Sequence, residues 1–244
     1  MASPRASPGQ LSDDAVVAQQ KRAAARAAAE LVEDGMRVGL GTGSTVAYLL
    51  DALAERELKD VSCVATSPGT ERAARALGLS LRPSEDVDEL DVAIDGADQI
   101  DPSGWLVKGG GGAHTREKIV AAAARRFVVI ASADKAVQEL SPPVPLELMR
   151  FGVQSTLRAL AHADLRPAGA GEPRSSSRGA QLSPDGGLLA NYLGTFADPR
   201  ELAARLSATP GVVEHGLFAP EMVSLILIAS ERGVERRSGA KVSD

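Results

Sequence analysis

The sequence predicts an α/β fold in which a Rossmann-like parallel-sheet domain is joined to a second, smaller α+β domain. Between Asp13 and Ala131, short apolar stretches alternate with helix-like stretches, and this alternation is typical of a parallel sheet covered by helices. Glycine-containing polar turns follow several of the apolar stretches. Prolines at positions 142, 143 and 145 then mark a hinge, and two further strand–helix pairs follow it.

These observations divide the chain into three parts. Residues 1–11 are rich in Ser, Pro and Ala without periodicity, and they predict a disordered leader. The apolar stretch 223–228 predicts a final strand that returns to the first sheet, so we expect the α/β domain to comprise residues 12–141 plus 221–244. The smaller α+β domain then covers residues 142–220.

The first domain is expected to begin with a helix. Ser12, followed by two aspartates, is a favourable N-cap, and the Ala-rich stretch after it predicts a helix up to Glu33 that stops at Gly35. Beyond this helix, continuous apolar residues predict strands, and the stretches between them have helical character. In chain order the expected strands are 37–40, 61–65, 91–94 and 127–131, and the expected helices are 46–56, 71–77 and 115–125.

The second domain is expected to be less regular. Residues 151–162 predict a helix, and the Gly-, Ser- and Arg-containing stretch 169–179 predicts a loop or flexible insertion. In chain order, a turn at 185–187, a strand at 188–192 and a helix at 198–206 follow. From Glu231 onward the polar sequence predicts a frayed tail.

Composition and charge exclude several classes of protein. The chain has 27 Lys and Arg against 32 Asp and Glu, a net charge of −5, and only 3% aromatic residues, which argues against a nucleic-acid surface. No apolar run approaches the roughly 20 residues of a membrane helix, and the N-terminus has no apolar signal region, so we expect a cytoplasmic protein without membrane contact. Cys63 is the single cysteine and allows neither an intrachain disulfide nor a cysteine metal cluster. An anionic ligand therefore needs a local positive site.

The first candidate site is the loop Gly41-Thr42-Gly43-Ser44-Thr45, between a predicted strand and a predicted helix. Glycines allow the backbone to approach a ligand closely, successive N–H groups and a helix N-terminus attract anions, and three hydroxyls add donors. The loop is therefore suited to phosphate. It lacks the lysine of a Walker A loop, and Ser44 stands where a dinucleotide fingerprint needs its third glycine. A plain strand-to-helix turn remains the alternative.

The second candidate site is the pair Asp95 and Asp98, placed just after an apolar stretch. Ligands of parallel α/β sheets bind at the carboxyl ends of the strands, so this pair can act in acid–base chemistry or bind sugar hydroxyls. It can also hold a divalent metal. The alternative without a function is an Asx turn that caps a helix.

The third candidate site begins at Lys108 and continues through four glycines to Glu117. Four consecutive glycines lose much backbone entropy on folding, so a plain connector explains them poorly. If the loop covers a ligand, a lysine and a carboxylate converge on it, and Glu117 can act as a general base. The alternatives are Lys108 as a surface charge, Glu117 as a first-turn helix acid, and a metal held by His114 and Glu117.

Together these stretches resemble the ribose-5-phosphate isomerase family of type A. The order and spacing of several motifs carry the resemblance, which extends from about residue 12 to about residue 230. The matching segments are 38–45 (VGLGTGST), 91–98 (DVAIDGAD), 108–118 (KGGGGAHTREK), 131–137 (ASADKAV), 145–150 and 210–219 (PGVVEHGLFA). Gln99 and Asn191 depart from the family, in which acids are common at these two places.

The resemblance implies the reversible isomerisation of D-ribose 5-phosphate and D-ribulose 5-phosphate in the non-oxidative pentose phosphate pathway, without a cofactor or a metal. In the family a carboxylate moves a proton between C2 and C1 through an enediolate, and the matching position is Glu117. Asp95 and Asp98 match the aspartates that act on the sugar hydroxyls and ring opening, and Lys108 matches the lysine that steadies the enediolate. Substrate binding is implied for Lys21, Thr42, Gly43, Ser44, Thr45, Gly109, Gly110, Gly111 and Lys135. The family also implies a homo-oligomer, either a dimer or a tetramer.

Other functions fit parts of this pattern. A sugar-phosphate-sensing domain of a transcription regulator keeps a phosphate loop and loses catalytic groups. Here, however, no basic helix-turn-helix precedes the loop, and the set of Asp, Lys and Glu residues is complete. An amino-sugar-phosphate deaminase or an acyl-CoA transferase is the remaining alternative, and a glutamate nucleophile would separate the transferase from the isomerase.

Overall fold

A computed structural model of the chain describes residues 12–83, 85, 88–175 and 179–241, so the predicted leader 1–11 lies outside the described residues. The largest sheet has six strands in the order β13-β12-β6-β3-β1-β2. They are β1 Arg37–Leu40, β2 Ser62–Ala65, β3 Leu90–Gly96, β6 Ala124–Ser132, β12 Leu225–Ser230 and β13 Gly233–Ser238. All neighbouring pairs are parallel except β12 with β13. The predicted α/β fold with a parallel-sheet core is confirmed, and β12 returns to the first sheet as expected.

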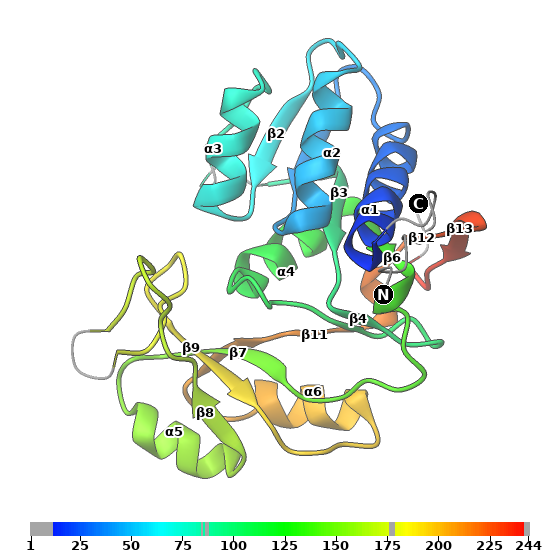
Figure 1. Ribbon diagram of the computed structural model, residues 1–244. Coiled ribbons are helices and arrows are strands. Elements are labelled where there is room, and N and C mark those ends of the chain that lie inside the picture. The colour runs from blue at the N-terminus through cyan, green and yellow to red at the C-terminus, as the bar shows by residue number, and fades with distance from the viewer. Residues whose placement is uncertain (1–11, 84, 86–87, 176–178, 242–244) are drawn as a thin grey trace, which may run out of the picture.

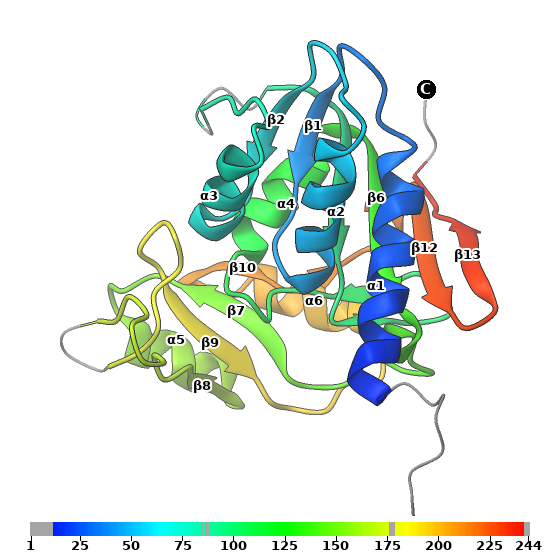
Figure 2. The same ribbon diagram turned by 45° about the horizontal axis from the view of Figure 1, so that its top comes forward.

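Helices cover both faces of this sheet because its strands are apolar on both sides. The helices of this part are α1 Asp13–Ala29, α2 Ser44–Ala54, α3 Pro68–Ala76 and α4 His114–Ala123. Val128 of β6 packs in a cluster with α1 and α2, whereas its neighbour Phe127 packs in a cluster with α4. Figure 2 shows α1 and α2 in front of the sheet and α4 behind it. The strand period of two therefore distributes the apolar residues over two helix layers.

The first helix starts where the sequence predicts and ends earlier. The Ser12 hydroxyl caps it by accepting a hydrogen bond from the Ala15 N at 3.3 Å. The helix ends at Ala29 rather than at Glu33, because the Leu31 amide already donates to the carbonyl three residues back, in a tighter turn. The helices α2, α3 and α4 begin earlier than predicted. Their first residues are Ser44, Pro68 and His114, whereas the predicted starts were 46, 71 and 115.

A second sheet has four antiparallel strands in the order β10-β7-β9-β8, and a three-stranded sheet has the order β11-β5-β4. Figure 1 shows the four-stranded sheet, with its two helices, below the six-stranded sheet. This part of the chain has an apolar cluster of its own. The elements are β4 Gln99–Ile100, β5 Leu106–Val107, β7 Val144–Leu148, α5 Val153–Leu160, β8 Ala163–Leu165, β9 Leu188–Tyr192, α6 Pro199–Ser207, β10 Val212–His215 and β11 Leu217–Phe218.

Two predictions about strand ends are wrong. The tail from Glu231 was expected to fray, but β13 pairs with β12 along its whole length. A turn at Gly233 (φ +113°) reverses the chain, and Val234 packs against the first apolar cluster, while the charged side chains of this edge strand face solvent. β3 extends past its predicted end, because Asp95 and Gly96 still pair with β6. Asp95 is therefore a residue of the strand itself rather than of the turn that follows it.

The predicted loop 169–179 follows β8. Its described residues, 169–175 and 179, contain no helix or strand, although Arg174 forms an isolated bridge with Gln181. Among the described helices, none is both long and apolar enough to cross a membrane.

Candidate active site

Asp95 joins two neighbouring strand ends, because it lies near the carboxyl end of β3 beside the loop that follows β1. Its side chain is 4% exposed. Its Oδ1 accepts hydrogen bonds from the Thr42 N at 3.0 Å and from the Gly96 N at 2.7 Å. This approach requires glycine at position 41, since a Cβ atom on Gly41 would lie 1.9 Å from Asp95 Oδ1. One buried carboxylate thus fixes the loop after β1.

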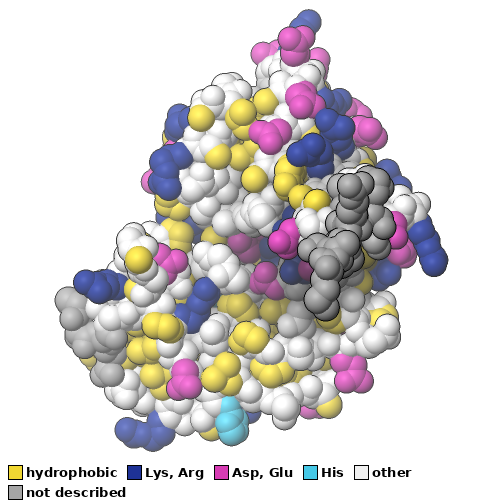
Figure 3. Space-filling view, viewed as in Figure 1, with side chains coloured by type: hydrophobic (Ala, Val, Ile, Leu, Met, Phe, Trp, Pro, Cys, Tyr) yellow, Lys and Arg dark blue, Asp and Glu magenta, His cyan; other side chains and the backbone are white. Residues whose placement is uncertain are grey.

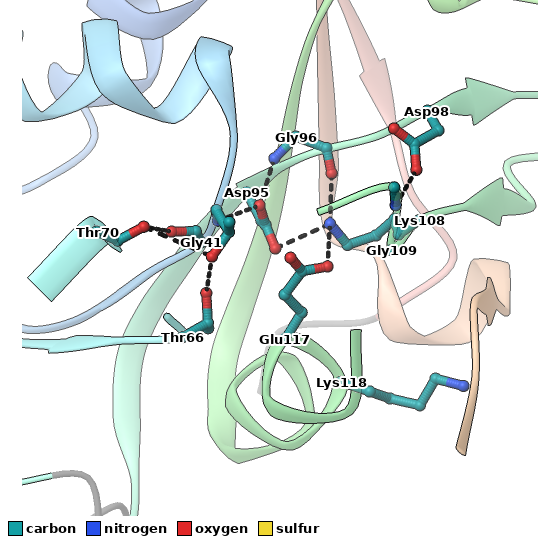
Figure 4. A network of polar contacts seen from close by, with 12 residues as sticks. Gly41, Thr66, Thr70, Asp95, Gly96, Asp98, Lys108, Gly109, Glu117 and Lys118 are labelled. Atoms are coloured by element: carbon teal, nitrogen blue, oxygen red, sulfur yellow. Dashed lines mark hydrogen bonds and ion pairs between the residues drawn. The ribbon is translucent and has the colours of Figure 1, made fainter. Parts of the chain in front are cut away.

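Lys108 brings two buried carboxylates together (Figure 4). Its Nζ lies 2.8 Å from Asp95 Oδ2 and 3.1 Å from Glu117 Oε2, and it donates to the Gly96 carbonyl oxygen at 2.6 Å. Lys108 directly follows β5, and Glu117 lies in the first turn of α4. The glycine loop between them folds the chain back so that the two charges meet. The ammonium group occupies the space between the two carboxylates.

The buried site contains two carboxylates and one ammonium group, so the two acids share a single positive charge. Burial and the neighbouring Asp95 charge raise the pKa of Glu117 to about 8, although Lys108 acts in the opposite direction. Burial acts to lower the pKa of Lys108, but the two carboxylates outweigh it and raise this pKa, so Lys108 stays an ammonium ion. Glu117 can therefore take up and release a proton near neutral pH, as a general base must.

The glycine loop is held in place from two sides. On one side, Asp98 Oδ2 accepts a hydrogen bond from the Gly110 N at 2.8 Å. On the other, Arg166 donates to the Gly109 carbonyl oxygen at 3.1 Å and to the Gly110 carbonyl oxygen at 2.7 Å. Gly109 needs its glycine, because its φ is +105° and a Cβ there would lie 2.7 Å from His114 Nδ1. The sequence analysis missed Arg166, which carries no local signal because it comes from the residues after β8.

The N-terminus of α2 forms the other end of the site. Gly43 (φ +120°) turns the chain into this helix, whose first N–H groups lack partners within the helix and attract anions. Lys21 of α1 reaches the same place, where its Nζ donates to Ser44 Oγ at 2.9 Å. Lys135 follows β6, lines the same pocket and pairs with Asp134 at 3.1 Å. Positive charge therefore gathers locally in a protein whose net charge is −5.

Two further threonines support the loop after β1. Thr66 Oγ1 lies 2.8 Å from Thr42 Oγ1, and Thr70 Oγ1 donates to the Gly41 carbonyl oxygen at 2.9 Å. The sequence analysis did not single out either residue. Both follow β2, which lies next to β1 and is parallel to it. The carboxyl ends of the two strands therefore lie side by side, so polar residues after the neighbouring predicted strand were the signal that could have identified them.

These groups surround one pocket of about 160 Å³. All predicted site residues line it except Asp95, whose carboxylate contacts Lys108 instead. Gly96 and Ala97 also line it and were missed by the sequence analysis. Figure 3 shows acidic and basic side chains side by side in the hollow between the upper and lower parts of the molecule. The lining residues are Lys21, Thr42, Gly43, Ser44, Thr45, Gly96, Ala97, Asp98, Lys108, Gly109, Gly110, Gly111, Glu117 and Lys135.

His114 was considered as a metal ligand together with Glu117. The His114 ring is fully buried and its nitrogens have no hydrogen-bond partner among the described residues. Burial lowers the pKa of His114 to about 3, so the ring is neutral. In the described part of the chain, no group of three or more His, Cys, Asp and Glu side chains is arranged to hold a metal ion. We therefore interpret His114 as a packing residue beneath the glycine loop.

Comparison with known sequences finds similarity to a known family. The sequence model of the family ribose 5-phosphate isomerase A (phosphoriboisomerase A) matches residues 62–233. The chain is 50% identical over 219 residues to ribose-5-phosphate isomerase A from Methylorubrum extorquens, an alignment that covers 86% of this chain and 92% of the relative. It is 45% identical over 223 residues to the protein of the same name from Caulobacter vibrioides, covering 89% of this chain and 96% of the relative.

Solved structures show the same similarity in three dimensions. A ribose 5-phosphate isomerase A from Methanocaldococcus jannaschii superposes with a TM-score of 0.81 at 32% identity, covering 90% of this chain and 98% of that structure. A D-ribose-5-phosphate isomerase in complex with phospho-erythronic acid superposes with a TM-score of 0.83 at 31% identity, covering 91% of this chain and 99% of that structure. The similarity therefore extends over nearly the whole chain.

Proposed function

The chain belongs to the ribose 5-phosphate isomerase A family, and from this premise we propose that it is an aldose–ketose isomerase for D-ribose 5-phosphate and D-ribulose 5-phosphate. The observation that carries the proposal is the meeting of the Glu117 carboxylate and the Lys108 ammonium, 3.1 Å apart, in a pocket that also contains the N-terminus of α2. A proton-transfer group and an anion site thus face one small cavity. A phosphorylated sugar has the two matching ends.

The phosphate end of the substrate is proposed to lie at the start of α2. The backbone N–H groups and hydroxyls of Ser44 and Thr45 supply donors, and Lys21 and Lys135 supply positive charge. A sugar phosphate carries nearly two negative charges at neutral pH. When the phosphate group is bound, the carbon atoms of the sugar are oriented toward Glu117.

The chemical step is proposed to be a proton transfer between C2 and C1. Glu117 removes the proton from C2 of the open-chain aldose, the C–H electron pair forms the C1–C2 double bond, and the carbonyl oxygen on C1 becomes an oxyanion. Lys108 stabilises this charge, because its ammonium already lies in the pocket. The C2 hydroxyl proton then passes to the C1 oxygen, so the negative charge moves to the C2 oxygen. Glu117 returns its proton to C1 as the C2 carbonyl forms, which produces the ketose. Asp98 lines the pocket and is proposed to contact the sugar hydroxyls, whereas Asp95 positions Lys108 and Thr42.

Isomerisation in D₂O tests this proposal most directly. With purified protein, EDTA and D-ribose 5-phosphate, we expect NMR to show D-ribulose 5-phosphate with deuterium next to the carbonyl, because the proton held on Glu117 can exchange with solvent. EDTA is expected to have no effect, since the Lys108 ammonium occupies the space between the two buried carboxylates. Product without deuterium would point to a shielded proton transfer or a hydride shift. Binding without turnover would favour the non-catalytic sugar-phosphate sensor.

The pH dependence of the reaction should report the ionisation of Glu117. We expect kcat/KM to increase with pH and to level off above about pH 8, because the base must be unprotonated and the pKa of Glu117 is raised to about 8 in the free protein. Initial rates at low substrate concentration from about pH 6 to about pH 10 measure this. A phosphate group ionises near pH 6, so a plateau that is already complete at about pH 7 would contradict the assignment.

We also propose a homo-oligomer that acts in the cytoplasm. The oligomer is supported by exposed apolar side chains beside the edge strand β10, where Phe151 is 89%, Met149 53% and Val213 47% exposed. The location is supported by Cys63, which is a buried free thiol suited to a reducing compartment.

A further inference from the structure

The first turn of α4 is attached to the second sheet at three side chains that surround Glu117. Thr115 contacts Glu147 of β7, and Arg116 contacts Asp185 in the turn before β9. Lys118 pairs with Glu214 of β10 at 2.6 Å. Each anchor on the helix thus meets a carboxylate from the part of the molecule that does not carry the pocket.

Glu147 differs from the other two carboxylates because it is buried, with a residue exposure of 3%. It accepts hydrogen bonds from the Thr115 hydroxyl and from the Ser183 hydroxyl, the latter at 2.6 Å. The chain at Gly187 passes so close that a Cβ there would lie 2.2 Å from Glu147 Oε1. A buried carboxylate held on both oxygens has little freedom to move.

Glu147 also organises the turn that holds Arg116. The Ser183 hydroxyl oxygen accepts from the Asp185 N at 3.2 Å and from the Gly187 N at 3.1 Å. A hydroxyl has a single proton, and that proton is donated to Glu147. Asp185, placed by this turn, then accepts two hydrogen bonds from the Arg116 guanidinium, at 2.7 and 2.5 Å. Glu147 therefore reaches α4 by two routes, directly through Thr115 and indirectly through Asp185.

We propose that Glu147 is a positioning residue that sets the place of the Glu117 carboxylate by holding the first turn of α4. This inference rests on the proposed isomerase function. Proton transfer needs the base aligned with the reacting carbons, and a displacement of about 1 Å can lower a rate about 100-fold. The proposed phosphate end of the pocket lies on α1, α2 and the residues after β6, whereas in the described part of the chain the side-chain hydrogen bonds of Glu147 go to Thr115 and Ser183. Loss of the Glu147 contacts should therefore affect kcat much more than KM.

A pair of substitutions at Thr115 tests the direct route. Thr115→Val removes the hydroxyl and keeps the side-chain size, whereas Thr115→Ser keeps the hydroxyl. We expect Thr115→Val to lower kcat about 10- to 100-fold with KM changed less than about twofold, and Thr115→Ser to stay close to the wild type. Equal losses in the two variants, or a rise in KM with an unchanged kcat, would overturn the proposal.

Glu147→Gln provides a second variant at the centre of the network. It converts one carboxylate oxygen into a donor and removes the charge, so the Thr115 hydroxyl loses its charge-assisted hydrogen bond. We expect a lower kcat, and the double variant with Thr115→Val should be no slower than the slower single variant, because both break one contact. A lower midpoint of unfolding with an unchanged kcat would reduce Glu147 to a structural role. A wild type without isomerase activity would refute the proposed function, whereas an active wild type with fully active variants would refute only the positioning role.

Discussion

Glu117→Gln will lower kcat by about 10²- to 10⁴-fold, the usual contribution of general acid–base catalysis, while the sugar phosphate still binds. Glutamine has the shape of glutamate, and its amide oxygen can still face the Lys108 ammonium that lies 3.1 Å from Glu117 Oε2. It cannot take up the proton that must leave C2. The proposed phosphate site, at Ser44 and Lys21, is untouched.

Steady-state rates and calorimetric binding of D-ribose 5-phosphate measure the two halves of this expectation. Glu221→Gln is a matched control, because it makes the same change in a surface ion pair with Arg200, outside the pocket. The control should keep the wild-type kcat. An unchanged kcat in Glu117→Gln would remove Glu117 from the role of base, and a loss of binding without a change in kcat would assign it to substrate binding.

Lys108→Met will reduce both activity and stability. The methionine fills most of the space of the lysine stem, but it leaves the carboxylates of Asp95 and Glu117 buried without a cation. Breaking a buried ion pair in this way typically destabilises a protein by about 3–5 kcal/mol. The loss of the ammonium should also lower kcat by about 10²- to 10³-fold, since the enediolate loses its stabilising charge.

The destabilisation by Lys108→Met should depend on pH. Without the ammonium, both carboxylates have pKa values above those of the unfolded chain, so the folded state binds more protons and its stability falls as pH rises. Urea unfolding at about pH 6 and about pH 9 should show the larger loss at the higher pH. Arg75→Met, in an exposed ion pair with Glu71, is the control and should change stability little. Equal effects of the two substitutions would show that Lys108 does not balance the buried carboxylates.

The positions of the site residues along the chain could be predicted well, because they follow successive strands. Thr42 comes after β1, Asp98 after β3, Lys108 after β5 and Lys135 after β6. Carboxyl ends of parallel strands meet at one edge of a sheet, so local sequence and one topological rule suffice to bring three of these residues into the same pocket. The position of Lys108 in this pocket follows only from the family resemblance or from the structure, since the antiparallel β5 is not part of that sheet.

Contacts between distant segments could not be predicted in this way. Asp95 was expected just after a strand, but β3 still pairs with β6 at this residue, and its carboxylate is buried against Lys108. Arg166 reaches the glycine loop from the residues after β8, and Glu147 reaches α4 from β7. No local signal points to Arg166, and Glu147 lies in the matching segment 145–150 without a role assigned to it. β13 was missed because its sequence is polar and lacks the apolar pattern used to predict strands. A polar sequence is compatible with an edge strand, which pairs on one side only.

The sequence by itself determined the chemical types at the site, namely a loop rich in glycines and hydroxyls, a lysine and a carboxylate, and the class of fold that gathers them. Residue type and hydrophobic period are local properties, so they can be read directly along the chain. Only the tertiary structure decided how these groups behave. It buried Asp95 and Glu117 around Lys108 and raised the pKa of Glu117 to about 8, because desolvation and charge pairing depend on distances in space rather than along the sequence.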